Sequence, residues 1–177
     1  MQNHSLVISN VRYLKQTKDG QSGLQGFCDT DWASQEHHHS ISSYVFMIDG
    51  GAVSWSSEKQ SLVSLSTTEA EYISLMHAAK EALWIQTFLV EIARPLCHPT
   101  TLFCDNQSAI AILKNTQYHA CTKHIDIRHH LICDCMDCGA ILVKYCPTAE
   151  NTADLFTKAL PAHKLKGLTL MMVLHSA

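Results

Sequence analysis

Four acidic residues occupy segments in which their side chains could act together. They are Asp29 in GFCDTDWA, Glu71 in STTEAEY, Asp105 in TLFCDNQSA and Asp154 in NTADLFTK. Carboxylates that share a partly dry site raise one another's pKa unless a cation neutralises them. Mg²⁺ prefers oxygen ligands and takes one or two carboxylates per ion, together with waters and substrate phosphate. Four acids from separate segments therefore predict two Mg²⁺ ions, with Mn²⁺ as a substitute, and phosphoryl chemistry.

The long helix predicted from about Ser66 decides which glutamate faces the site. Ser66 with Glu69 three residues later is a capping-box pattern. Positions at helical spacing from Glu71 form a continuous apolar stripe: Leu75, Ala78, Ala82, Ile85 and Leu89. The equivalent positions from Glu69 give a mixed face. We therefore expect Glu69 to cap the helix and Glu71 to point at a sheet.

The elements that must position these acids follow from the patterns along the chain. LQGFCDTDWA reads as a strand with Asp29 and Asp31 on one face, and SYVFMIDGGAVSWSS as a hairpin around Gly50 and Gly51. After the long helix come a buried strand over TTLFCD, two helices over NQSAIAILK and TKHIDIRHHLICDCMDC, a strand over AILVKYC, and a final helix over AENTADLFTKAL that Pro161 ends. This order predicts one layered α/β domain. Asp105 then lies at the carboxyl end of a strand, where open α/β sheets place their sites.

Composition limits the possible functions. The chain has 177 residues, 46% of them hydrophobic, and a net charge of −3. It lacks the overall positive charge of a free-standing nucleic-acid binder, so any such contact depends on a local patch. No apolar stretch approaches the length of a membrane span, and the start MQNHSLVISN lacks the pattern of a signal peptide. We expect a soluble intracellular protein that is not secreted and not bound to membrane.

The eight cysteines are expected to be reduced thiols that pack as small apolar residues. The segment HHLICDCMDCG also suggests zinc, through Cys133, Cys135 and Cys138 near His129 and His130. A helix would direct the three cysteines to different sides, which disfavours convergence on one ion. Zinc binding remains the lesser alternative.

Several blocks of the chain together resemble a known family. GFCDTDWAS, SSYVFMIDGGAVSWSSEKQSLVSLSTTEAEYISL, CDNQSAIAILKN, TKHIDIRHHLI and YCPTAENTADLFTKAL are similar to the ribonuclease H domain of copia-type retrotransposon polyproteins. NVRYLKQTKDG resembles the end of the preceding reverse transcriptase region. The resemblance divides the chain into a reverse transcriptase tail at 1–23, a ribonuclease H-like domain at 24–160 and a C-terminal tail at 161–177.

The resemblance implies a ribonuclease H-like α/β fold with a mixed five-stranded sheet flanked by helices. It implies an endonuclease that uses metal to hydrolyse the RNA strand of RNA–DNA hybrids during reverse transcription, with the hybrid and the reverse transcriptase region of the same polyprotein as partners. Asp29, Glu71, Asp105 and Asp154 match the family's catalytic and metal-binding acids. The expected location is a cytoplasmic virus-like particle or the nucleus.

Substrate contacts are expected from five residues in family-like motifs: Asn106, Gln107, Lys123, His124 and Arg128. For the last three, a solvated helix face is an equal alternative. The chain departs from the family at HHHS, where arginines are usual, at Ser43, where glycine is usual, and at Glu58, where lysine is usual. The histidine that many cellular ribonucleases H carry before the last helix is absent from VKYCPTAEN.

Each acid also has a purely structural interpretation. Asp105 could cap the following helix, Asp154 could be an exposed acid of a first helical turn, and Asp29 could be a turn residue. The tryptophans Trp32, Trp55 and Trp84 are expected in the core, in preference to base-stacking platforms.

Two rival functions use the same features. An integrase or transposase core has a similar layered fold and an acidic site, but with three acids in a different order. The second rival is a decayed or domesticated remnant that acts as a structural or interaction domain without catalysis.

Overall fold

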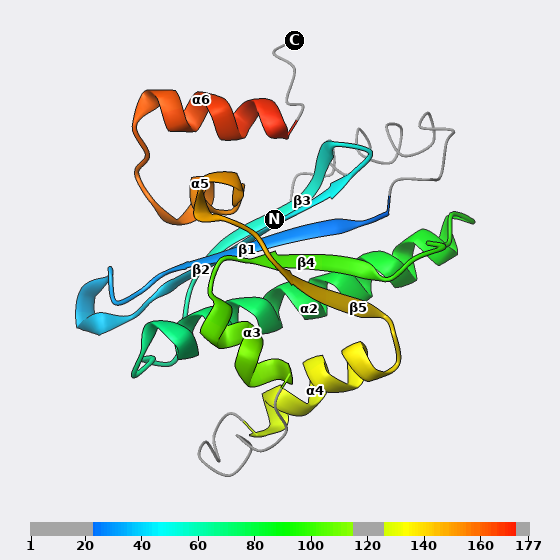
Figure 1. Ribbon diagram of the computed structural model, residues 1–177, viewed down its shortest axis with the longest axis horizontal. Helices are drawn as coiled ribbons and strands as arrows, with labels where there is room; N and C mark the ends of the chain where they lie inside the picture. The colour runs from blue at the N-terminus through cyan, green and yellow to red at the C-terminus, as the bar shows by residue number, and fades with distance from the viewer. Residues whose placement is uncertain (1–22, 115–125, 173–177) are drawn as a thin grey trace.

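The computed structural model describes residues 23–114 and 126–172. Its centre is a five-stranded sheet in the order β3-β2-β1-β4-β5 (Figure 1). The strands are β1 (Gln25–Asp31), β2 (Ile41–Ile48), β3 (Gly51–Lys59), β4 (Thr100–Cys104) and β5 (Ile141–Tyr145). β1, β2 and β3 pair antiparallel, whereas β4 runs parallel to both β1 and β5. The predicted mixed five-stranded sheet is therefore confirmed.

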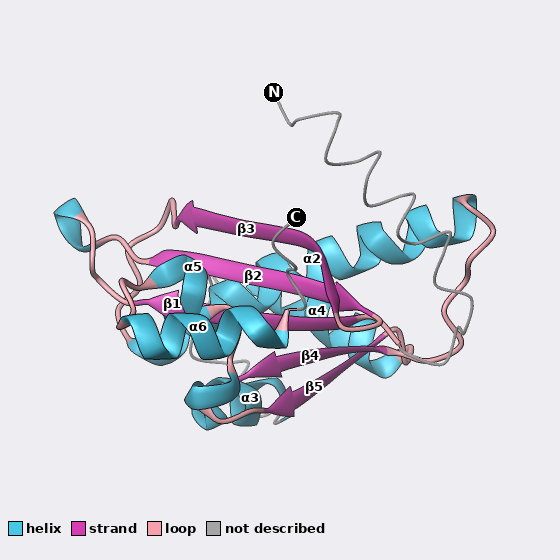
Figure 2. Ribbon diagram, turned by 90° about the horizontal axis from the view of Figure 1, so that it is seen from above, coloured by secondary structure: helices cyan, strands magenta, loops and turns pink. Residues whose placement is uncertain are grey.

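Helices cover both faces of the sheet. α2 (Thr67–Glu91), α3 (Gln107–Lys114) and α4 (Asp126–Asp137) lie on one face, and α5 (Asp154–Thr157) and α6 (Ala162–Met171) on the other (Figure 1, Figure 2). Two short 3-10 helices, η1 (Glu36–His38) and η3 (Thr148–Glu150), lie in connections. The larger apolar core packs under α2, and a smaller cluster that includes Val45, Met47, Ala153 and Met172 packs under α5 and α6. Among the described residues, no helix is both long and apolar enough to cross a membrane.

The N-terminus of α2 follows the predicted capping pattern. The Ser66 hydroxyl accepts a hydrogen bond from the Glu69 backbone N–H (3.2 Å), and the Glu69 carboxylate accepts one from the Leu65 backbone N–H (2.7 Å). The apolar stripe that Glu71 heads is buried along its whole length. The predicted helix register is therefore confirmed.

The β2–β3 hairpin turns one residue earlier than expected. β2 ends at Ile48 and β3 begins at Gly51, so the two turn residues are Asp49 and Gly50. Their φ angles, 52° and 80°, are both in the left-handed region. This matches the turn type that suits the twist of a two-residue hairpin, for which Asp-Gly is a preferred pair.

The predicted final helix over AENTADLFTKAL is wrong in length. The segment instead forms η3, an extended residue Asn151 and the single-turn α5, and a further helix, α6, follows Pro161. The Asn151 side chain donates to the Cys28 carbonyl of β1 (2.9 Å), which holds this part of the chain against the sheet in a non-helical form. Pro161 stands at the N-terminus of α6, where a missing N–H costs nothing.

The prediction that the three tryptophans lie in the core is also wrong. Trp32, Trp55 and Trp84 are 45%, 44% and 60% exposed. Trp84 stacks on Phe88 of the next turn of α2, and the Trp32 indole donates to the Ser64 carbonyl (3.3 Å). Trp55 lies on β3, the edge strand of the sheet that the described residues form. Local partners thus hold two of these rings at the surface.

Candidate metal centre

The parallel pairing of β1 and β4 brings the first two acids together. Phe27 is the register partner of Phe103, and the two rings stack 4.9 Å apart. Two residues further along the chain from each ring stand Asp29, inside β1, and Asp105, directly after β4, at the same end of the sheet. Asp29 is only 1% exposed, and Asp105 is half-buried. The expected position of Asp105 at a strand end is confirmed.

Asp154 approaches Asp29 and Asp105 from the face of the sheet that α5 and α6 cover. It begins α5, and two buried polar contacts fix the residues before it. Asn151 bonds to β1 as described, and the Ser43 hydroxyl of β2 donates to the Ala153 carbonyl (2.9 Å). Asp154 is completely buried, so it is not the exposed first-turn acid of the structural alternative. Ser43 lies within β2, so its difference from the family's glycine disturbs no turn.

The carboxylates form two overlapping groups. One carboxylate oxygen from each of Asp29, Asp105 and Asp154 lies within 4.8 Å of the others, and Glu71, Cys104 and Asp105 offer a second set of atoms within the same distance. Asp105 belongs to both groups. The oxygen ligands of the first set are those that Mg²⁺ and Mn²⁺ prefer, whereas the Cys104 thiol is a softer ligand. The residues present therefore fit hard divalent cations.

Two lysines that sequence reasoning missed contact the first group. The Lys158 ammonium lies 3.1 and 3.2 Å from the two carboxylate oxygens of Asp29 and 2.9 Å from Asp154 Oδ1. Lys164 of α6 lies 2.7 Å from Asp154 Oδ2. Thr157 donates its hydroxyl hydrogen to Asp29. The only sequence signal was the spacing of Asp154 and Lys158, which places both on one side of a helical turn.

Burial and charge set the pKa values of the acids. Burial raises the pKa of Asp29, although the Thr157 hydroxyl and Lys158 oppose this. Burial acts upward on Asp154 too, but the hydrogen bonds from Lys164 and Lys158 outweigh it and leave its pKa below the ordinary value. Glu71 is 7% exposed, and burial, with the neighbouring Cys104, Asp29 and Asp105, raises its pKa to about 10.

The Asp105 carboxylate bonds to a side chain and does not cap a helix. The Thr148 hydroxyl donates to Asp105 Oδ2 (2.7 Å). The cap of α3 is Asn106, whose Oδ1 accepts from the Ala109 backbone N–H (3.0 Å), so the capping interpretation of Asp105 is wrong. Asp29 lies inside β1, which likewise excludes a turn residue. Asp31 ends the same strand and is half-buried.

The structure places only some of the expected substrate contacts near the acids. Asn106 directly follows Asp105, and the exposed Gln107 begins α3. Lys123 and His124 lie outside the described residues. Arg128 lies in α4, but its side chain is outside what the structure describes.

The cysteines of α4, Cys133 and Cys135, and Cys138 directly after this helix have different neighbours. Cys133 faces the Leu113 carbonyl (3.9 Å), Cys135 is buried, and Cys138 donates to the carbonyl of Cys135 (3.4 Å). Among the described residues, both groups with metal-ligand geometry belong to the acidic site.

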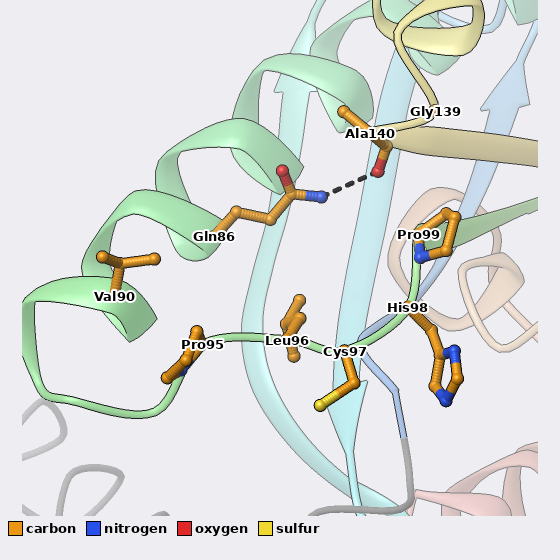
Figure 3. Close-up of a pocket in the computed structure, with 9 residues that line it drawn as sticks. All are labelled: Gln86, Val90, Pro95, Leu96, Cys97, His98, Pro99, Gly139 and Ala140. Atoms are coloured by element: carbon orange, nitrogen blue, oxygen red, sulfur yellow. Dashed lines mark hydrogen bonds between the residues drawn. The ribbon is translucent and has the colours of Figure 1, made fainter.

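A pocket of about 350 Å³ lies away from the acids (Figure 3). Its lining includes Gln86, Val90, residues 95–99 and residues 139–140, at the amino ends of β4 and β5. The Gln86 amide donates across it to the Ala140 carbonyl (2.9 Å). Because the acids lie at the carboxyl end of β4, this pocket is no part of the acidic site.

Comparison with curated proteins finds relatives among transposon polyproteins. The retrovirus-related Pol polyprotein from transposon TNT 1-94 of Nicotiana tabacum is 41% identical over 156 residues, which cover 86% of the chain. The match spans only 12% of that polyprotein's length. No protein-family model matches the chain.

Solved structures with a similar fold include a ribonuclease H1 and a viral protease-reverse transcriptase. A ribonuclease H1 isolated from compost matches with a TM-score of 0.56 at 15% identity, over 76% of this chain and 91% of that one. The foamy viral protease-reverse transcriptase in complex with RNA/DNA hybrid matches with a TM-score of 0.53 at 12% identity, over 86% of this chain and 19% of that one. At these identities the likeness establishes the fold.

Proposed function

We propose that this chain, which belongs to the Pol polyprotein family of copia-type transposons, is a metal-dependent endonuclease. It would hydrolyse the RNA strand of RNA–DNA hybrids, in keeping with its ribonuclease H-like fold. The observation that carries the proposal is the convergence of Asp29, Glu71, Asp105 and Asp154 in two overlapping groups. These acids, and the two ions they would share, are proposed as the catalytic centre.

The side chains of the site would have separate roles. Asp29 and Asp154 would hold one Mg²⁺ ion, Glu71 would hold the other, and Asp105 lies within reach of both groups. Bound cations of this kind lower the pKa of an attacking water and stabilise charge that develops on the phosphate. Thr148 and Thr157 orient Asp105 and Asp29 through hydrogen bonds. Asn151 and Ser43 hold Asp154 at the site by fixing α5 on the sheet.

Substrate choice would depend on the ribose 2′-hydroxyl and on the shape of the hybrid, which distinguish it from duplex DNA. We propose that Asn106, Gln107, Lys123, His124 and Arg128 contact the hybrid. The partner in the cell would be the reverse transcriptase region of the same polyprotein, and the location a cytoplasmic virus-like particle or the nucleus.

A cleavage assay tests the function directly. The purified chain is incubated with an RNA–DNA hybrid labelled on the RNA strand and, separately, with duplex DNA of the same sequence. We expect Mg²⁺-dependent cuts in the RNA alone and none with EDTA. Asp105→Asn, which keeps the shape and removes the charge, is the matched inactive control.

The rival function, a non-catalytic remnant, predicts another pattern. Such a protein would leave the hybrid intact in Mg²⁺ and in Mn²⁺ while still folding cooperatively. Equal cutting of duplex DNA would also contradict the proposal, because it would indicate a nuclease that ignores the 2′-hydroxyl.

A further inference from the structure

Lys158 occupies the position between two acids that a cation would take. Its ammonium bridges Asp29 and Asp154, which are 1% and 0% exposed, and it touches both oxygens of Asp29. The lysine is therefore a charged and well-coordinated ion within the metal-binding group itself.

We propose that Lys158 is the resident cation of the metal-free site and that it must leave its place between Asp29 and Asp154 before a divalent cation binds there. It is thus a positioning residue that sets the metal affinity of this group. The inference rests on the proposed function for the identity of the metal site, and it deepens that function by naming what competes with the metal.

The backbone at Lys158 suits such an exchange. Lys158 follows the last residue of α5 in an extended conformation, and its N–H bonds to the Asp154 carbonyl (3.2 Å). The side chain is 35% exposed, so its ammonium can rotate into water while the backbone stays in place. Asn151 and Ser43 still hold α5 on the sheet when the ammonium has moved.

Lys164 differs from Lys158 in its contacts. Among the described residues, its ammonium pairs with Asp154 Oδ2 and does not bridge to Asp29. A cation held by Asp29 and Asp154 Oδ1 would displace Lys158 and leave Lys164 on the outer oxygen. Substitution of Lys164 therefore removes the same charge close to the site without removing a competitor for the metal position.

The test measures Mn²⁺ binding by electron paramagnetic resonance without nucleic acid. If the ammonium holds the site about nine-tenths of the time, Lys158→Met should tighten binding about tenfold, because a competitor reduces apparent affinity by the fraction of competent protein. Lys164→Met should tighten it by no more than about threefold, as expected for the loss of a charge that does not compete directly. Lys166→Met, which changes an exposed residue of α6, should match the parent protein, and Lys158→Arg, which keeps the positive charge, should bind Mn²⁺ no more tightly than the parent protein.

Two outcomes would overturn the proposal. One is a Lys158→Met variant that binds Mn²⁺ no more tightly than the parent protein. The other is equal tightening by Lys158→Met and Lys164→Met, which would show a general effect of charge and no competition for the site.

A measurement on the unmodified protein covers the case in which Lys158→Met does not fold. The side-chain ammonium signals of ¹⁵N-labelled protein are followed by NMR as Mg²⁺ is added, with Lys158→Arg used for assignment. The Lys158 signal should shift to the position of a solvated lysine, and the Lys164 signal should change less. A Lys158 signal that stays in place at saturating Mg²⁺ would contradict the exchange.

These readouts are independent of the proposed function. If metal displaces Lys158 but the protein cuts no hybrid, the exchange is supported and the nuclease function is contradicted. If the protein cuts hybrid while Lys158 stays in place, the nuclease function is supported and the exchange is contradicted.

Discussion

The two halves of the acidic site balance their charge in different ways. In the lysine half, Asp29 and Asp154 receive Lys158, and Lys164 adds a second ammonium to Asp154. In the thiol half, Glu71 faces the Cys104 Sγ at 3.9 Å, and among the described residues no salt bridge involves it. The pKa of Asp154 is accordingly lowered, whereas that of Glu71 is raised to about 10.

The difference shows that one site uses both available solutions to carboxylate repulsion. At neutral pH without metal, Asp154 keeps its charge beside an ammonium, while Glu71 keeps a proton. In the lysine half, Asp29 and Asp154 would hold a metal ion in place of an ammonium, and in the thiol half Glu71 would hold one in place of its proton. Acid should therefore weaken the binding of metal to the thiol half in particular.

The largest expected effect is the loss of cleavage when either half loses its charge. Asp29→Asn and Glu71→Gln keep the shape of the side chain but remove a metal ligand. Each should lower the rate of hybrid cleavage by about 10²–10³-fold, the usual cost of losing one group that stabilises transition-state charge. Single-turnover rates with excess protein measure this. A fully active variant of either acid would remove that half from the catalytic site.

The second effect separates the halves by the stability of the metal-free protein. Glu71 has a pKa of about 10 when folded and an ordinary value of 4.5, so the native state loses stability relative to the unfolded chain as the pH rises above about 4.5. Glu71→Gln does not titrate. It should therefore be more stable than the parent protein by about 3 kcal/mol at pH 7, and by nothing near pH 4.

Thermal and urea unfolding in EDTA across this pH range measures that difference. A constant advantage at every pH would mean that the glutamine gains from packing and that the proton of Glu71 is not involved.

The lysine half should respond in the opposite direction. Asp154→Asn removes the partner of two ammonium groups, and Lys158 and Lys164 are about one-third exposed, so water recovers part of the loss. We expect a destabilisation of about 1–2 kcal/mol at pH 7 without metal. The folded-state pKa of Asp154 is lowered, so this contribution is present above its ordinary value and disappears as the pH falls through the folded-state value. Urea unfolding of both proteins at pH 7 and pH 3 tests the sign. A stabilising Asp154→Asn would show that the two halves do not differ.

The thiol half was the easier one to predict from sequence. Glu71 lies on a 25-residue helix whose apolar stripe fixes its direction, and Asp105 directly follows a short buried strand. Regular periodicity carries this information, since each side chain's face follows from its position. The order of strands and helices followed from the same patterns.

The lysine half depends on contacts that periodicity does not encode. α5 is a single turn, and its place on the sheet is set by Asn151 and Ser43, which bond to backbone far away in sequence. Lys164 reaches Asp154 only because α6 folds back after Pro161 and packs through Leu168 and Met172. Such long-range contacts override local propensity, which is also why the final helix was predicted too long.

The smallest effect concerns the other glutamate at the start of α2. Glu69 accepts a hydrogen bond from the Leu65 N–H and takes no part in either acidic group. Glu69→Gln keeps an acceptor oxygen and loses only the favourable charge near the helix N-terminus, which is worth about 0.3–1 kcal/mol. It should keep most of the cleavage activity, and its small loss of stability should stay constant above pH 6, whereas the gain in stability of Glu71→Gln over the parent protein should grow with pH. Cleavage rates and unfolding measured side by side for the two variants test which glutamate acts in the site. An inactive Glu69→Gln beside an active Glu71→Gln would place Glu69, and not Glu71, there.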